Sequence, residues 1–226
     1  MRKFIIFISV IFLLPFLMYS QNETQTGSEL PLFLNEEFSD NTNEWLVDDD
    51  EDILIKIENG RLHYQHKKEE TGYYTWNYFL LDEFEPYSIA TTIHWIEGTE
   101  NHGYGLLWGM EDIENYFSFE ITRNGYYRIT GMEFGEWKEY KGWTQSDHIN
   151  STTGINKIGI GNSGENLNFY INDNYVDQMK DEVFYDDGIG FVIWKNQTIE
   201  IENLVIHGYE FYFDYDLDFL DEIIGE

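Results

Sequence analysis

Residues 115–130 read NYFSFEITRNGYYRIT, two alternating segments on either side of an Asn-Gly pair. In the first segment the odd positions are Phe117, Phe119 and Ile121, whereas the even positions are more polar. Such alternation is typical of a β-strand that buries one face, because successive side chains point to opposite sides of a sheet. The odd face is therefore predicted to be core.

The parity of the apolar positions sets the length of the loop at this Asn-Gly pair. Tyr127 and Ile129 are the apolar residues after the turn, so odd residues stay on one face across it. A two-residue loop would pair odd with even residues, whereas a three-residue loop at 123–125, with glycine in the left-handed position, keeps the parity. This register puts Glu120 opposite Arg128 on the non-core face, where we expect an exposed pair.

A second Asn-Gly pair, at residues 59–60, behaves differently. Apolar positions change parity across it, being Ile53, Ile55 and Ile57 before the pair and Leu62 and Tyr64 after it. A two-residue type I′ hairpin produces such a change, so Ile57 is predicted to pair with Leu62.

Further strand-like segments follow one another at roughly ten-residue spacing. They are residues 32–38, 73–81, 87–96, 103–110, 137–141, 157–161, 167–171, 175–179, 188–194 and 199–206. No long helical period separates them, so the sequence predicts an all-β fold, an antiparallel two-sheet jelly-roll sandwich. Segment 73–81 has aromatic residues on both faces and is predicted to be an inner strand.

Segment 103–110 has large residues on one face, among them Trp108, and glycines on the other. A row of glycines allows a backbone or a ligand to approach closely. We expect Trp108 to offer its ring to a ligand; the alternative is that Trp108 packs against the second sheet while the glycines line the ligand site.

The two ends of the chain differ from its middle. Arg2 and Lys3 precede an apolar run, which predicts a secretory signal peptide and hence a secreted, periplasmic or cell-surface protein. A retained anchor is the alternative, but the run is short for a membrane span and Pro15 interrupts it. The expected organisation is a signal peptide at 1–20, a disordered leader at 21–30, a jelly-roll β-sandwich at 31–207 and an acidic-aromatic tail at 208–226.

Charge and cysteine content exclude several classes of partner. The 226 residues include 43 acidic and 13 basic side chains, for a net charge of −30, and no cysteine. This charge repels nucleic acid and anionic lipid, so we expect no nucleic-acid partner and no membrane insertion after signal cleavage. Five adjacent carboxylates at 48–52 lack the ligand spacing of a calcium loop. We expect no cofactor, with calcium as the alternative.

The order of short motifs adds a resemblance. The motifs are FSDNTNEW at 38–45, NGRLHY at 59–64, GYGLLWG at 103–109, NGYYRI at 124–129, FYIND at 169–173 and IGF at 189–191. This order resembles the concanavalin A-like lectin/glucanase superfamily, in its branch of bacterial extracellular jelly-roll domains related to sugar-binding and keto-disaccharide-hydrolase-like modules. The resemblance covers about residues 31–207 and implies a ligand groove on the concave sheet.

The catalytic pattern that the resemblance implies for glucanases, E-x-D-x-x-E, is missing from the predicted sandwich. Residues 111–114 have the wrong spacing, and residues 216–221 have the spacing but carry aspartates where the pattern has glutamates. Glu200 and Glu202 form only an i, i+2 pair, whose separation on a strand does not by itself exclude a retaining glycosidase. The six histidines show no zinc-binding spacing.

The sequence favours a secreted, non-catalytic carbohydrate-binding module. Aromatic rings offer apolar faces to sugar C–H groups, and charged groups bind hydroxyls. The predicted ligand-binding residues are Trp76, Trp108, Tyr116, Glu120, Tyr126 and Arg128. Two alternatives remain: a structural, adhesion or interaction domain that binds an extracellular protein, and a glycoside hydrolase with non-standard carboxylates. No catalytic or metal-binding residue is assigned.

Overall fold

A computed structural model describes residues 30–162, 164–180, 182 and 184–211. The predicted signal peptide, most of the leader and the tail beyond residue 211 lie outside these residues. The strands are β1 (Leu32–Glu36), β2 (Asp48–Asp49), β3 (Ile53–Ile57), β4 (Leu62–His66), β5 (Gly72–Tyr78), β6 (Ser88–Gly98), β7 (Gly103–Asp112), β8 (Asn115–Thr122), β9 (Tyr126–Glu133), β10 (Glu136–Gln145), β11 (Ile155–Asn162), β12 (Asn166–Ile171), β13 (Asn174–Lys180), β14 (Gly188–Trp194) and β15 (Gln197–His207). Within the described part of the chain, no helix is long and apolar enough to cross a membrane.

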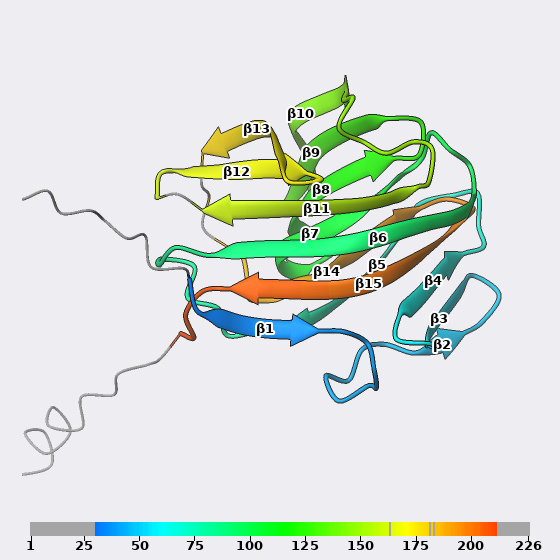
Figure 1. The fold of residues 1–226 in the computed structure, drawn as a ribbon, viewed down its shortest axis with the longest axis horizontal. Helices are drawn as coiled ribbons and strands as arrows, with labels where there is room; N and C mark the ends of the chain where they lie inside the picture. Colours follow the sequence, from blue (N-terminus) through cyan, green and yellow to red (C-terminus); the bar gives the residue numbers. More distant parts are fainter. Residues whose placement is uncertain (1–29, 163, 181, 183, 212–226) are drawn as a thin grey trace, which may run out of the picture.

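These strands form two antiparallel sheets packed face to face (Figure 1). The nine-stranded sheet has the order β13-β12-β11-β6-β15-β4-β3-β2, and β1 also pairs with β15. The six-stranded sheet, which lies behind it in Figure 1, has the order β10-β9-β8-β7-β14-β5. The predicted all-β, two-sheet jelly-roll sandwich is confirmed.

Both predicted hairpins have the register that parity required. Between β8 and β9, Glu120 pairs with Arg128, and Gly125 has φ 94° at the end of the three-residue loop. Between β3 and β4, Ile57 pairs with Leu62 around residues 59–60, both of which have positive φ. Local sequence thus specifies these two turns.

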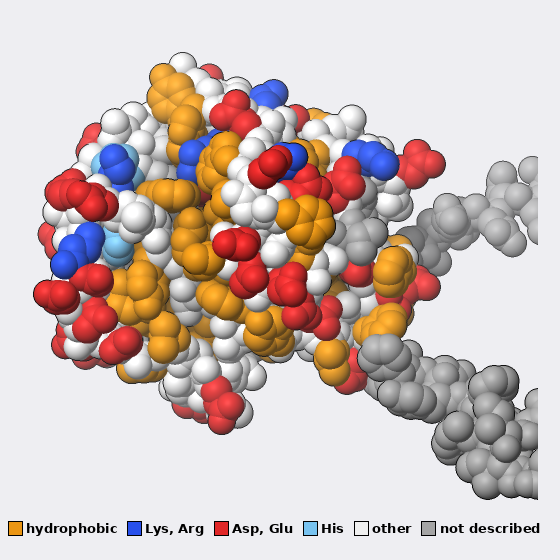
Figure 2. Space-filling model, turned by 180° about the vertical axis from the view of Figure 1, so that it is seen from behind, with side chains coloured by type: hydrophobic (Ala, Val, Ile, Leu, Met, Phe, Trp, Pro, Cys, Tyr) orange, Lys and Arg blue, Asp and Glu red, His pale blue; other side chains and the backbone are white. Residues whose placement is uncertain are grey.

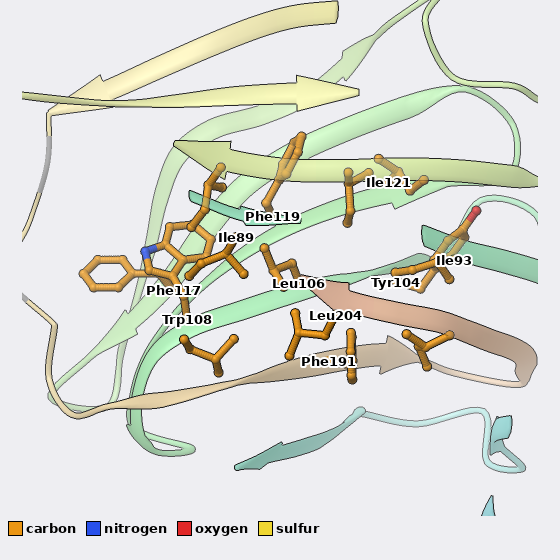
Figure 3. Packing of buried hydrophobic residues seen from close by; sticks show 14 of the residues in the cluster. Ile89, Ile93, Tyr104, Leu106, Trp108, Phe117, Phe119, Ile121, Phe191 and Leu204 are labelled. Carbon is orange, nitrogen blue, oxygen red and sulfur yellow. The ribbon is translucent and has the colours of Figure 1, made fainter. Parts of the chain in front are cut away.

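The core lies between the sheets (Figure 3). Phe117, Phe119, Ile121 and Ile129 are each at most 1% exposed, as predicted for the odd face of β8 and β9. Trp108 also lies in this core, so the prediction that it offers a ring to a ligand is wrong. The space between the sheets needs large side chains from β7, and Gly103 lies on the outward face instead, beside Glu120.

Contacts of Trp108 show how it bridges the two sheets. Its ring stacks on Phe117 at 5.5 Å, and it meets Phe169 of the facing sheet at 5.9 Å. With 1% of its surface exposed, it belongs to the packing of the sandwich.

Strand β5 was predicted to be an inner strand, but it is an edge of the six-stranded sheet, where it pairs with β14. Aromatic residues occur on both faces for another reason. Tyr73 packs edge-on against Tyr64 at 6.3 Å in the core, while Tyr74 packs against Tyr116 at 5.2 Å on the outward face. β5 therefore has aromatic residues on both faces because other side chains pack against each face, although only one of its edges is paired with a strand.

Candidate functional site

The outward face of the six-stranded sheet carries a dense group of aromatic side chains. We call it the aromatic platform; it comprises Tyr74, Trp76, Tyr116, Tyr126, Trp137, Trp143 and Trp194, with Arg128 among them. Figure 2 views the molecule from behind Figure 1 and shows hydrophobic side chains gathered in a band across the middle. This face is opposite the core because core-facing and outward-facing residues alternate along each strand.

Arg128 is enclosed by indole rings from two other strands. Its Cζ lies 4.6 Å from the ring centroid of Trp143, 5.1 Å from that of Trp137 and 5.2 Å from that of Trp194. Each such cation–π contact is worth about 0.5–1 kcal/mol when exposed and more when water is excluded. The three rings therefore hold the guanidinium in one position.

Glu120 lies beneath Arg128 and neutralises it. Arg128 donates from Nε and Nη2 to Oε2 at 3.1 and 2.8 Å, and from Nη2 to Oε1 at 3.1 Å. Ser118 Oγ donates to Oε1 at 3.0 Å. The predicted neighbouring pair is confirmed, but the prediction that it is exposed is wrong, because the side chains of Glu120 and Arg128 are only 1% and 15% exposed.

A glycine of β7 makes room for the buried carboxylate. A Cβ on Gly103 would lie 2.2 Å from Glu120 Oε2 and 3.1 Å from Trp143 Cη2, so a larger residue would displace both. The row of glycines on β7 therefore accommodates part of the platform's own ion pair. The sequence predicted that the glycine row admits a backbone or a ligand, whereas at Gly103 the group that approaches closely is a side chain of the protein.

Tyr116 also supports the platform from below. It is 2% exposed, and its hydroxyl lies 3.1 Å from that of Tyr74. Burial raises the pKa of both phenols above the ordinary value for tyrosine. A ligand on the surface would meet Tyr74 before Tyr116.

The six predicted ligand-binding residues thus divide by depth. Tyr126 is exposed, Trp76 is half-buried, and Arg128 reaches the surface between the rings. Tyr116 and Glu120 are on the predicted face but are buried supports. Trp108 is in the core.

Four platform residues were missed from the sequence: Tyr74, Trp137, Trp143 and Trp194. For Trp194, residues 188–194 read GIGFVIW, which is apolar throughout, so no alternation assigned its face. For the two β10 residues the pairing with β9 shifts register twice, so alternation alone did not assign their face.

The carboxylates Glu200 and Glu202 lie on the outward face of the nine-stranded sheet, away from the platform. Arg61 Nη1 contacts Glu200 Oε2 at 2.8 Å and lowers the pKa of Glu200, chiefly through this hydrogen bond. His94 Nε2 lies 2.6 Å from Glu202 Oε2. Both carboxylates are thus engaged by basic side chains, which favours a structural role over a catalytic one.

The acidic run at 48–52 is likewise engaged by neighbouring groups. Lys67 pairs with Asp49 at 2.9 Å and Lys68 with Asp52 at 2.7 Å. Hydrogen bonds from the backbone N–H groups of Ile53 and Asp52 lower the pKa of Asp50. Across the described residues, no group of three or more His, Asp or Glu side chains is placed to hold a metal ion.

Comparisons with known proteins identify the fold. No protein-family model and no curated protein matches the chain. A protein of unknown function with a galectin-like fold from Bacillus subtilis is similar, with a TM-score of 0.59 and 11% identity over 82% of this chain and 99% of that one. The Emp47p carbohydrate recognition domain gives a TM-score of 0.52 and 13% identity over 79% of this chain and 94% of that one.

A longer protein contains a similar domain. The K247S mutant of the GH43 protein BlXynB from Bacillus licheniformis gives a TM-score of 0.58 and 11% identity over 77% of this chain. The matched region is 39% of that protein's length. At these identities the comparisons show the fold alone, a two-sheet jelly-roll sandwich, and such a fold carries several unrelated functions.

Proposed function

We propose that this protein is a secreted, non-catalytic carbohydrate-binding module of the concanavalin A-like kind, and that it binds a glycan on the aromatic platform. One observation carries the proposal: Arg128 is enclosed by Trp137, Trp143 and Trp194 on the outward face of a jelly-roll sheet. This cluster lies outside the core between the sheets. Holding its partly exposed side chains in fixed positions costs conformational entropy, which indicates a role other than core packing.

The chemistry of the platform suits a neutral sugar. Trp137 and Trp143 are 44% and 41% exposed, and their ring faces can pack on sugar C–H groups. Nη1 of Arg128 donates no hydrogen bond to any described residue and is a donor for a hydroxyl group. Since Glu120 neutralises Arg128, the platform has no free positive charge to attract an anionic glycan.

Glu120 supports binding over hydrolysis. A glycosidase needs two carboxyl groups placed on either side of the scissile bond, about 5–9.5 Å apart depending on mechanism. Glu120, the carboxylate at the centre of the platform, is fully buried and bound bidentately by Arg128, so it is not placed to act as acid, base or nucleophile. The predicted signal peptide at 1–20 supports export, and the likeness in fold to the Emp47p carbohydrate recognition domain supports a glycan as the partner.

Titration of the purified protein with four neutral hexasaccharides tests this function: cellohexaose, xylohexaose, mannohexaose and laminarihexaose. Trp143→Ala should weaken binding of whichever probe binds by about tenfold or more, equivalent to about 1.4 kcal/mol. Because Trp143 is partly exposed, the unfolding midpoint should change little.

Phe134→Ala is the matched control, since Phe134 is an 80% exposed aromatic at the β9–β10 turn, away from Arg128. Its affinity should equal that of the wild type. Unchanged affinity in Trp143→Ala would refute the platform as the site, and release of reducing sugar from the bound probe would favour the hydrolase alternative. Absence of binding by all four probes would favour the interaction-domain alternative.

A further inference from the structure

The outward face of the nine-stranded sheet contains a hollow of about 440 Å3, on the opposite side of the molecule from the aromatic platform. Strands β6, β11 and β12 form it. Its lining includes Ser88, Ala90, Gly159, Gly161 and Tyr170. Its volume is in the range of sites that hold small molecules, about 300–1,000 Å3.

Tyr170 forms an aromatic wall of this hollow. The flanking residues Phe169 and Ile171 are fully buried in the core, so alternation directs Tyr170 outward, where it is 37% exposed. The ring of Tyr175 meets it edge-on at 6.1 Å and supports its orientation. The hollow thus has the supported ring of Tyr170 on one side and small residues at its base.

Packing does not explain the glycine at 161. A Cβ there would lie 3.8 Å from Tyr170 Cε2 and 4.0 Å from Ser88 Cβ, both ordinary contact distances. At Gly103, by contrast, a Cβ would meet a carboxylate oxygen at 2.2 Å. Space beside the Tyr170 ring is therefore left open although the sheet could fill it with a side chain.

The polar groups of the hollow favour an uncharged ligand. Lys157 and Asp173 both line it and pair with each other at 2.7 Å, so their charges balance in a protein of net charge −30. Ser88 contributes a hydroxyl group to the same lining. An aromatic wall, a floor of small residues and neutral hydrogen-bonding groups match the two faces of a sugar ring.

We propose that this hollow is a second glycan-binding site, which takes a neutral sugar residue against Tyr170. The ligand class rests on the proposed function of the platform, whereas the hollow itself does not depend on it. Because the two sites lie on opposite sheets, one molecule can bridge two glycan chains.

Two variants test the hollow by different means. Tyr170→Ala removes the wall, and Gly161→Val fills the space beside the ring with a residue that strands accept. The variants are titrated calorimetrically with the same four hexasaccharides, and their folding is checked by the unfolding midpoint. Tyr209→Ala, which removes another exposed tyrosine that does not line the hollow, is the control.

The wild type is expected to bind two equivalents of a hexasaccharide. Tyr170→Ala and Gly161→Val should each weaken one of the two sites by about tenfold or more, Trp143→Ala should weaken the other site to the same extent, and the Trp143→Ala/Tyr170→Ala double variant should weaken both. Wild-type stoichiometry and affinity in both hollow variants would overturn the second site and leave the platform intact.

The opposite pattern separates the two proposals. If binding is lost in Tyr170→Ala and Gly161→Val but is unchanged in Trp143→Ala, the hollow is the site and the platform proposal fails. If none of the four probes binds the wild type at millimolar concentration, both proposals are wrong.

Discussion

Replacing Glu120 with glutamine is expected to lower the free energy of unfolding by about 3 kcal/mol. The amide keeps the shape of the side chain but removes the negative charge that neutralises Arg128. The guanidinium would stay enclosed by three indole rings with no counter-ion. The substitution therefore measures the effect of the Glu120 charge on stability while the packing of the side chain stays nearly the same.

The magnitude follows from the geometry of the pair. Glu120 is fully buried, and three N–H donations at 2.8 to 3.1 Å join it to Arg128. Removing one partner of a buried pair typically costs about 3–5 kcal/mol, because the other charge is left uncompensated. The low end applies here, since the Arg128 side chain is 15% exposed and its cation–π contacts remain.

Urea denaturation followed by tryptophan fluorescence measures the effect. Glu58→Gln is the control, because the Lys56–Glu58 pair is 40% and 55% exposed, so its loss should leave the denaturation midpoint nearly unchanged. The double variant Glu120→Gln/Arg128→Met should recover part of the loss, because it removes the guanidinium that Glu120→Gln alone leaves without a counter-ion. A loss within about 1 kcal/mol for Glu120→Gln alone would refute the buried, uncompensated charge on which this reasoning depends.

Phe119→Ala is expected to cost about 3–5 kcal/mol, because Phe119 is fully buried between the sheets; a denaturation measurement below about 1 kcal/mol would contradict its assignment to the core. Burial, with a further contribution from Asp177, raises the pKa of Tyr127 from 10.0 to about 12. The folded protein therefore holds this proton more tightly than the unfolded chain, and the stability it contributes is present below pH 10 and lost as the pH rises through 12. Absorbance titration of the phenolates should show a tyrosine of raised pKa in the wild type that the Tyr127→Phe variant lacks. If the wild type and the variant lose stability identically as the pH rises, the predicted contribution of Tyr127 is wrong.

Local patterns were sufficient for both Asn-Gly hairpins. The register of a tight hairpin depends on a turn of two or three residues and on the parity of the residues beside it, all within about ten residues. Glu120 opposite Arg128 follows from that parity alone. The boundaries of β14 were also predicted, since turn residues flank an apolar run there.

Exposure, in contrast, depended on strands distant in the sequence. Trp137 and Trp143 of β10 and Trp194 of β14 cover the Glu120–Arg128 pair, so a pair expected in solvent is buried. Parity also left open which face of β7 meets the second sheet. Trp108 faces the core because the space between the two sheets is filled by large side chains.

The sequence by itself determined the all-β class, the two hairpin registers and the odd core face of β8 and β9, because alternation and turn chemistry are local. Tertiary structure alone decided that β14 lies between β5 and β7, which brings Trp194 to Arg128 across the sheet. It also decided that Gly103 receives a carboxylate whereas Gly161 leaves a hollow open. The physical reason is that the neighbours of a side chain across a sheet come from distant segments, and only their packing shows which space is filled.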